Sequence, residues 1–180
     1  MSDGDGDNQD ASAIGSYPDV AADFELAVER RGDRTVVSAR LGQPAQRCYE
    51  LFSDADLIPL WLWVVGKAVV QERDARGRAL RVDFIGSLER ASIAYTLAYS
   101  YDDALREVQW HHLGGGVKTL AGAARFEPRD EQSCTLLYTL SSELRENLPA
   151  WADDLYRQRP AETVVIDFCE WIEHHSRGGT

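Results

Sequence analysis

Hydrophobic and polar residues alternate along most of the chain between residues 67 and 140. Alternation with a period of two is typical of strands that bury one face and leave the other in water. Clusters of Gly, Pro and Asp separate the alternating segments and mark turns. The pattern predicts six strands, over 67–73, 80–84, 93–99, 108–112, 120–126 and 136–140. Strands that follow one another without intervening helices pair as an antiparallel meander.

The segments on either side of this meander have other periods. Residues 34–41 are rich in β-branched side chains and predict a further strand. Pro44 then begins a helical period that ends near Phe52, and a turn over 55–60 leads to Trp61. A C-terminal helix over 160–175 carries one apolar stripe. The stripe comprises Ala161, Val164, Val165, Phe168, Cys169 and Ile172, with Glu162, Asp167, Glu170 and Glu173 expected to face water.

Three segments carry less specific patterns. Residues 1–18 are polar and acidic and predict a disordered tail, and residues 148–159 predict a short helix. Residues 19–33 fit either a strand or a helix, and the turn at 31–33 favours a hairpin onto the strand over 34–41. The expected organisation is therefore a tail (1–18), an additional segment whose secondary structure the pattern leaves undecided (19–33), and one domain over 34–176.

Composition and charge narrow the possible partners. The 180 residues, 44% hydrophobic, suffice for one domain with a buried core. The net charge is -11, and residues 1–33 hold nine acidic and two basic residues. The absence of a basic stripe argues against nucleic acid and anionic membranes as partners. No apolar run approaches the roughly 18 residues of a membrane span.

The cysteines and the short motifs give expectations about location and chemistry. Cys48, Cys134 and Cys169 are far apart and lack metal-ligand spacing, so we expect reduced thiols in a cytoplasmic protein without a secretory signal. The sequence has no nucleophile elbow, phosphate loop or dinucleotide fingerprint. We therefore expect neither a cofactor nor a metal.

One stretch resembles a known superfamily. Residues 35–61, TVVSARLGQPAQRCYELFSDADLIPLW, place Pro44, Tyr49, Phe52, Asp54 and Trp61 in order after a strand. This order resembles the opening of Bet v 1/START-like (SRPBCC) proteins, among them bacterial polyketide cyclase/dehydratase-like and coenzyme Q-binding-like members. The segments YTLAYSYDDALREVQW, LAGAARFEP, CTLLYTL and VVIDFCEWIE are similar to the later strands and the closing helix. The resemblance covers residues 34–175.

The resemblance implies an α+β helix-grip fold, in which a curved antiparallel sheet wraps a long C-terminal helix around a hydrophobic cavity. It implies binding of a lipid, sterol, quinone or polyketide. Only some members are enzymes, and many bacterial members act in secondary metabolism as cyclases, dehydratases, carriers or self-resistance proteins. The fold does not choose among these roles.

The candidate ligand-binding residues lie on the expected inner face, the C-terminal helix and the first tryptophan pair. They are Trp61, Trp63, Phe84, Tyr95, Tyr99, Trp110, His112, Tyr138, Val165 and Phe168. Either they line a cavity, with hydroxyl and indole groups as polar handles, or they are core residues. His112 is a candidate general base or hydrogen-bonding group, or else a polar residue at a strand end.

Two further points stay open at this stage. Arg81 and Asp83 are expected to face water, whereas a register shift of one residue would place them in the cavity as an ion pair. Three functions fit the sequence: a binding protein for a hydrophobic or aromatic small molecule, a polyketide cyclase or dehydratase, or a protein-interaction module with a filled core. The chain is expected to be a monomer or a homodimer.

Overall fold

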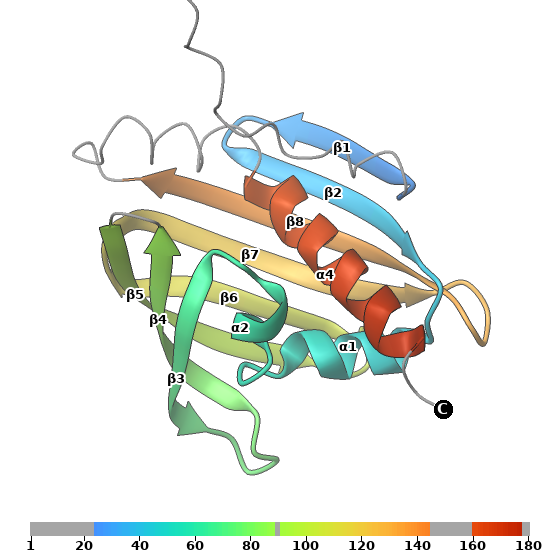
Figure 1. Cartoon of the computed structure of the whole chain (residues 1–180), viewed down its shortest axis with the longest axis horizontal. Coiled ribbons are helices and arrows are strands. Elements are labelled where there is room, and N and C mark those ends of the chain that lie inside the picture. Colours follow the sequence, from blue (N-terminus) through green and yellow to red (C-terminus); the bar gives the residue numbers. More distant parts are fainter. Residues whose placement is uncertain (1–23, 89–90, 145–159, 178–180) are drawn as a thin grey trace, which may run out of the picture.

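The computed structural model describes residues 24–88, 91–144 and 160–177. Eight strands form one antiparallel sheet, and helices lie on one side of it (Figure 1). The strands are β1 (Leu26–Arg31), β2 (Arg34–Leu41), β3 (Val65–Arg73), β4 (Ala79–Leu88), β5 (Ala91–Asp102), β6 (Glu107–Gly115), β7 (Val117–Pro128) and β8 (Cys134–Leu144). The helices are α1 (Ala45–Ser53), α2 (Ile58–Trp61) and α4 (Pro160–Arg177). The expected tail (1–18) and the expected helix over 148–159 lie outside the described residues.

The strand order confirms the predicted meander. The order across the sheet is β1-β2-β8-β7-β6-β5-β4-β3, so each strand from β3 to β8 pairs with its neighbours in sequence. β2 pairs with β8. The helices α1 and α2 then carry the chain from β2 to β3, which is the strand at the opposite edge of the sheet. The hydrogen bonds between β2 and β8 thereby join the start of the domain to its last strand.

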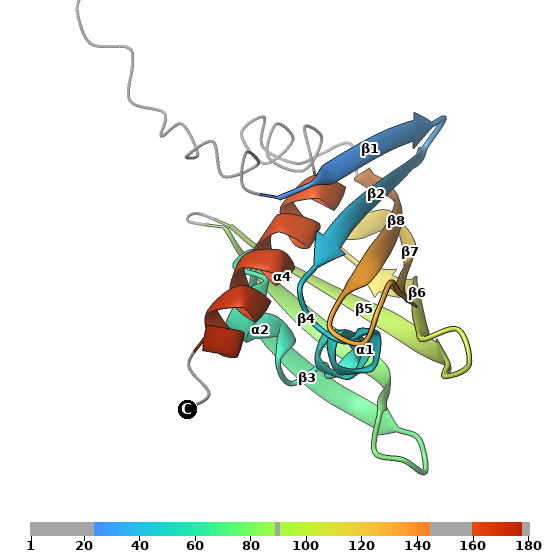
Figure 2. The ribbon, with the colours of Figure 1, turned by 90° about the vertical axis from the view of Figure 1, so that its right-hand side faces the viewer.

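The C-terminal helix covers the inner face of the sheet. Figure 2 shows α4, α1 and α2 on the same side of the curved sheet. Five residues of the predicted stripe are at most 1% exposed: Ala161, Val165, Phe168, Cys169 and Ile172. The predicted α+β fold, with a long helix packed on a curved antiparallel sheet, is confirmed.

The segment that fitted either a strand or a helix forms strand β1 over Leu26–Arg31. β1 pairs with β2 along its whole length, and Gly32 makes the turn between them with a φ of 63°. This left-handed conformation suits glycine, because other residues place a Cβ against the backbone there.

Two acidic residues of α4 depart from the expectation that they face water. Glu162 is only 7% exposed because Arg30 of β1 donates a hydrogen bond to its Oε1. Asp167 is half-buried. The helical period alone could not predict either position, since the covering groups come from β1 and from the connection after α2.

The ends of two hairpins attach α1 to the sheet. The hydroxyl of Tyr49 donates to Oδ1 of Asp103 at 2.9 Å, and Arg78 donates to the same oxygen at 2.8 Å. Arg78 also lies 4.3 Å from the ring centroid of Tyr101. These contacts tie α1, which lies against β6 and β7, to the ends of the β3–β4 and β5–β6 hairpins.

Candidate functional site

Aromatic side chains from neighbouring strands lie side by side on the inner face of the sheet. The register pairs Phe84 with Tyr95, and Tyr99 with Trp110. The rings of Phe84 and Tyr95 stack at 5.4 Å, and those of Trp110 and Tyr138 also lie 5.4 Å apart. Cross-strand pairing therefore brings together four of the predicted residues, and Tyr138 on β8 reaches Trp110 across the intervening strand β7.

Phe52 is the centre of this aromatic cluster, and sequence reasoning did not select it as a site residue. Its ring lies 5.0 Å from Phe168, 5.2 Å from Trp61 and 6.3 Å from both Trp110 and Tyr138. The helical spacing of α1 predicted that the side chain of Phe52 would point toward the core. The pattern could not show that α1 inserts it between the sheet and α4.

Solvent exposure divides the predicted site residues into groups. Phe84, Val165 and Phe168 are at most 2% exposed and belong to the core. Trp61, Trp110 and Tyr138 are also buried. Tyr95, Tyr99 and His112 are half-buried, and Trp63, after α2, is 46% exposed. A ligand that bound without any rearrangement of the protein would contact mainly the half-buried residues Tyr95, Tyr99 and His112.

Tyr99 has an environment different from that of a surface tyrosine. Burial raises the pKa of its hydroxyl well above the usual range, and the nearby phenols of Tyr95 and Tyr138 add to this shift. Burial also raises the pKa of Tyr138. These hydroxyls therefore stay protonated and can donate or accept hydrogen bonds.

Two buried ring nitrogens have no partner among the described residues. They are Nε1 of Trp61 and Nε2 of His112. His112 lies opposite Leu97 on the inner face, while His111 is exposed on the other side. Because buried polar atoms are nearly always hydrogen-bonded, such atoms are candidate contacts for a bound molecule or water.

A β-bulge lies directly beside His112. Leu97 pairs with His112, but Thr96, the residue before Leu97 on β5, pairs with Gly114. Leu113 is therefore the additional residue, and it is 53% exposed on the outer face. Bulges change the direction of a neighbouring side chain and often lie next to functional sites.

Asp167 and the backbone after α2 meet at one flank of α4. The backbone N–H of Trp63 donates to the Asp167 carboxylate, and burial raises the pKa of this carboxyl to about 7. Its Oδ2 atom is buried without a partner in the described part of the chain. This polar contact holds the exposed Trp63 segment against α4.

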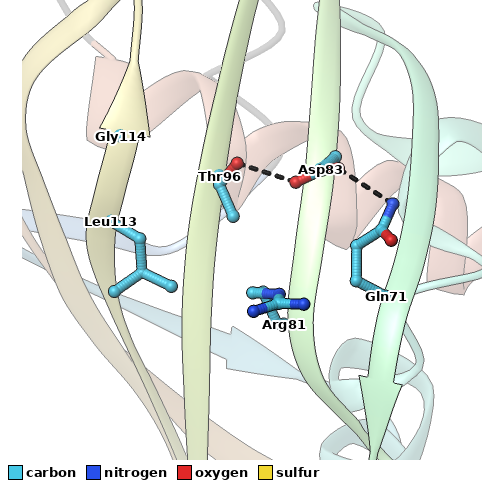
Figure 3. Close-up of a pocket in the computed structure, with 6 residues that line it drawn as sticks. All are labelled: Gln71, Arg81, Asp83, Thr96, Leu113 and Gly114. Carbon is cyan, nitrogen blue, oxygen red and sulfur yellow. Dashed lines mark hydrogen bonds between the residues drawn. The ribbon is translucent and has the colours of Figure 1, made fainter.

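The outer face carries a shallow hollow of about 360 Å³, which Figure 3 shows. In it, Asp83 accepts hydrogen bonds from Thr96 Oγ1 at 2.7 Å and from Gln71 Nε2 at 2.9 Å. Arg81 also lines this hollow, so Arg81 and Asp83 lie outside the aromatic cluster, as the predicted register required. The hollow is open and polar, which does not suit an apolar ligand.

Metal and membrane features can be assessed for the described ranges only. No group of three or more His, Cys, Asp or Glu residues in 24–88, 91–144 and 160–177 could hold a metal ion. No described helix is both long enough and apolar enough to cross a bilayer.

Comparison with solved structures identifies the fold. A START superfamily protein from Mycobacterium smegmatis is 15% identical, matches over 78% of this chain and 97% of its own, and gives a TM-score of 0.68. The Zhui aromatase/cyclase from a Streptomyces species is 15% identical over 82% of this chain and 98% of its own, with a TM-score of 0.67. A norcoclaurine synthase mutant from Thalictrum flavum is 13% identical over 84% and 98%, with a TM-score of 0.56.

The chain has the helix-grip fold of START-like proteins. No protein-family profile matches the sequence, and no curated protein matches it. The likeness to these solved structures confirms the resemblance of residues 34–175 at the level of the fold. At these identities the comparisons assign no ligand or reaction to the helix-grip domain described here.

Proposed function

We propose that the helix-grip domain binds a hydrophobic, aromatic small molecule between α4 and the inner face of the sheet. A polyketide-type metabolite is the preferred class, with quinones and lipids as the other members of the test panel. The role would belong to bacterial secondary metabolism, in biosynthesis or in self-resistance. Burial of apolar surface would provide most of the affinity.

The observation that carries this proposal is the group of half-buried side chains on the inner face, Tyr95, Tyr99 and His112. Burial also raises the pKa of the Tyr99 hydroxyl, which therefore stays protonated. A side chain surrounded by protein that still keeps accessible surface is expected where it lines an internal space. Tyr95 and His112, which are also half-buried on the inner face, extend this lining.

The polar atoms in the lining suit an aromatic ligand that carries oxygen atoms. Tyr99 offers a protonated hydroxyl, and Trp61 and His112 offer ring nitrogens without partners in the described residues. A few polar groups among apolar side chains orient a ligand while apolar contact supplies the affinity. The aromatase/cyclase among the structural neighbours is consistent with an aromatic ligand for this domain.

A second candidate function is a cyclase or dehydratase of the same fold. Nε2 of His112 is buried and has no partner within the described ranges, which favours this function, because an imidazole nitrogen can accept a proton from a bound ligand. Turnover of a polyketone lost in His112→Gln, with binding retained, would support the enzyme. Binding without turnover would support the carrier.

The first test is a tryptophan-fluorescence titration of the full chain with aromatic polyketides, quinones and fatty acids. We expect saturable quenching by one class, because Trp61 and Trp110 lie within the aromatic cluster. Tyr99→Ala should weaken binding about tenfold or more, the effect of losing roughly 1.4 kcal/mol. Tyr99→Phe separates the contribution of the hydroxyl from that of the ring.

Ser100→Ala is the matched control, because Ser100 is the next residue on β5 and is exposed on the opposite face. Equal weakening by Tyr99→Ala and Ser100→Ala would contradict a ligand site on the inner face. No saturable response across the panel would instead favour the interaction module with a filled core.

A further inference from the structure

The outermost strand β1 has one edge that no described strand covers. β1 pairs with β2 along its whole length, and β2 pairs with β8 on its other side. β1 therefore ends the sheet, as Figures 1 and 2 show. In an edge strand the N–H and C=O groups of every second residue point away from the sheet, so such an edge can pair with a further strand.

The two edge strands of the sheet differ in their regularity. β3, at the other edge, has an irregular register at three places along its pairing with β4. Bulges of this kind are one device by which proteins prevent a sheet edge from pairing further. The register between β1 and β2 has no such irregularity, and β1 contains no proline. β1 is therefore the edge whose backbone is suited to extend the sheet.

An apolar side chain on β1 is left largely uncovered. Val28 is 41% exposed, although Val37, its partner on β2, is 0% exposed and belongs to the core. The two side chains lie on the same face, because directly opposite residues of paired strands share a face. A strand added beside β1 would cover part of the exposed surface of Val28.

We propose that a second copy of this chain occupies this edge, so that two β1 strands pair antiparallel about a two-fold axis at Val28. An axis perpendicular to the sheet keeps the inner faces of both copies on one side and uses the same surface of each copy. Val28 then lies opposite the partner's Val28, and each covers the other. The two eight-stranded sheets become one continuous sheet.

The charges along β1 select this register. With the axis at Val28, Arg31 lies opposite the partner's Glu25, and the symmetry repeats this pair at the other end. With the axis at Ala27, Glu25 would lie opposite the partner's Glu29. With the axis at Glu29, this carboxylate would lie opposite the same carboxylate of the partner. Opposite charges that face each other across strands stabilise the pairing, whereas like charges destabilise it.

The other charged contacts of β1 are compatible with this pairing. Arg30 reaches to α4, where Glu162 accepts its hydrogen bond. Glu29 and Arg31 form an ion pair within one chain, but both side chains are largely exposed, so the contact is weak and the guanidinium keeps donors for the partner's Glu25.

The size of this interface predicts the strength of the dimer. β1 has only six residues, so the paired strands bury a small area and we expect a weak, concentration-dependent dimer. The aromatic cluster takes no part in the interface. The proposal therefore stands independently of the ligand proposed for the helix-grip domain.

Sedimentation velocity of the full chain over a range of concentrations tests the interface. We expect the average mass to rise from that of one chain toward that of two. Arg31→Glu and Glu25→Arg should each weaken the dimer about tenfold or more, because each places like charges opposite each other at both ends of the interface. An equimolar mixture of these two variants should dimerise again, since every pair across the interface then joins opposite charges.

Lys67→Glu is the matched control, because it changes the net charge by the same amount as Arg31→Glu but lies on the other edge strand, β3. It should leave the dimer unchanged. A mass that stays that of one chain at every concentration would overturn the proposal. A dimer that persists unchanged in both single variants would also overturn it, as would a mixture of the two variants that fails to dimerise, since neither result fits this register.

Discussion

The indole ring of Trp110 occupies the space above Gly122, its partner across the β6–β7 pair. A methyl group on Gly122 would lie 2.7 Å from Cε2 of Trp110 and closer still to Cζ2 and to the carbonyl oxygen of Thr139. Only a residue without a side chain lets the indole approach the strand in this way. Gly122 thereby places Trp110 against Tyr138.

Gly122→Ala should therefore destabilise the domain by about 1–3 kcal/mol, the usual effect of overpacking a core. Part of the clash is with the backbone at Thr139, which cannot move aside as a flexible side chain could. Urea denaturation followed by circular dichroism measures the change. Gly114→Ala is the matched control, since a methyl group there meets nothing within 4 Å. We expect the control to change the stability by no more than about 1 kcal/mol.

Asp103 should make the stability of the domain depend on pH at the acid end. The hydrogen bond from Tyr49, with the positive charges of Arg78 and Arg76, lowers the pKa of Asp103 below its ordinary value of 3.8. A depressed pKa stabilises the fold above the ordinary value, and this stabilisation disappears as the pH falls through the folded-state pKa.

Asp103→Asn should accordingly be less stable than the unaltered chain at pH 7, and the difference should shrink below pH 4. Urea midpoints measured between pH 7 and pH 3 give this comparison. Glu131→Gln is the control, because it removes one exposed carboxylate that has no ion pair among the described residues. A difference for Asp103→Asn that stays constant with pH would contradict the assignment.

The alternation of residues predicted the faces of the sheet because a strand's period is a local property. Val108, Trp110 and His112 all lie on the inner face, and the stripe on α4 also faces the sheet. Coverage is not local. Phe84 and Tyr95 are cross-strand partners on one face, yet Phe84 is buried and Tyr95 is half-buried. This difference depends on which groups cover each side chain, which the period cannot show.

Contacts between distant segments were the part that the sequence did not reveal. Arg30 and Glu162 are 132 residues apart, and Tyr49 and Asp103 are 54 residues apart. The bulge at Leu113 was also not visible in the sequence, because the pattern of residue types does not change where the bulge interrupts the pairing. The resemblance of residues 35–61 supplied the fold because the order of several short motifs carries information that each motif lacks.

The ion pair between Arg30 and Glu162 should be needed mainly because Glu162 is buried. Arg30→Ala would leave that buried carboxylate without its cation, and we expect a loss of about 1–2 kcal/mol. Adding Glu162→Gln to this variant should recover part of the loss. A double-mutant cycle of urea unfolding energies measures the coupling. Arg31→Ala should have almost no effect, since its partner Glu29 is also exposed; equal losses for both arginine variants would contradict the argument.

Asp167 should make the domain less stable as the pH rises through neutrality. Burial raises the pKa of its carboxyl from 3.8 to about 7, so the folded state holds a proton that the unfolded chain has released. Stability is then complete below pH 4 and falls as the pH rises through 7. Asp167→Asn should thus stabilise the domain at pH 8 by about 1–2 kcal/mol, less than the full shift implies because the side chain keeps some contact with water, and should have no such benefit at pH 4. Urea unfolding at both values checks this, with Glu173→Gln on the same helix as control. A gain that is equal at both pH values would contradict this argument, because the carboxyl is already protonated at pH 4 and has no charge to remove.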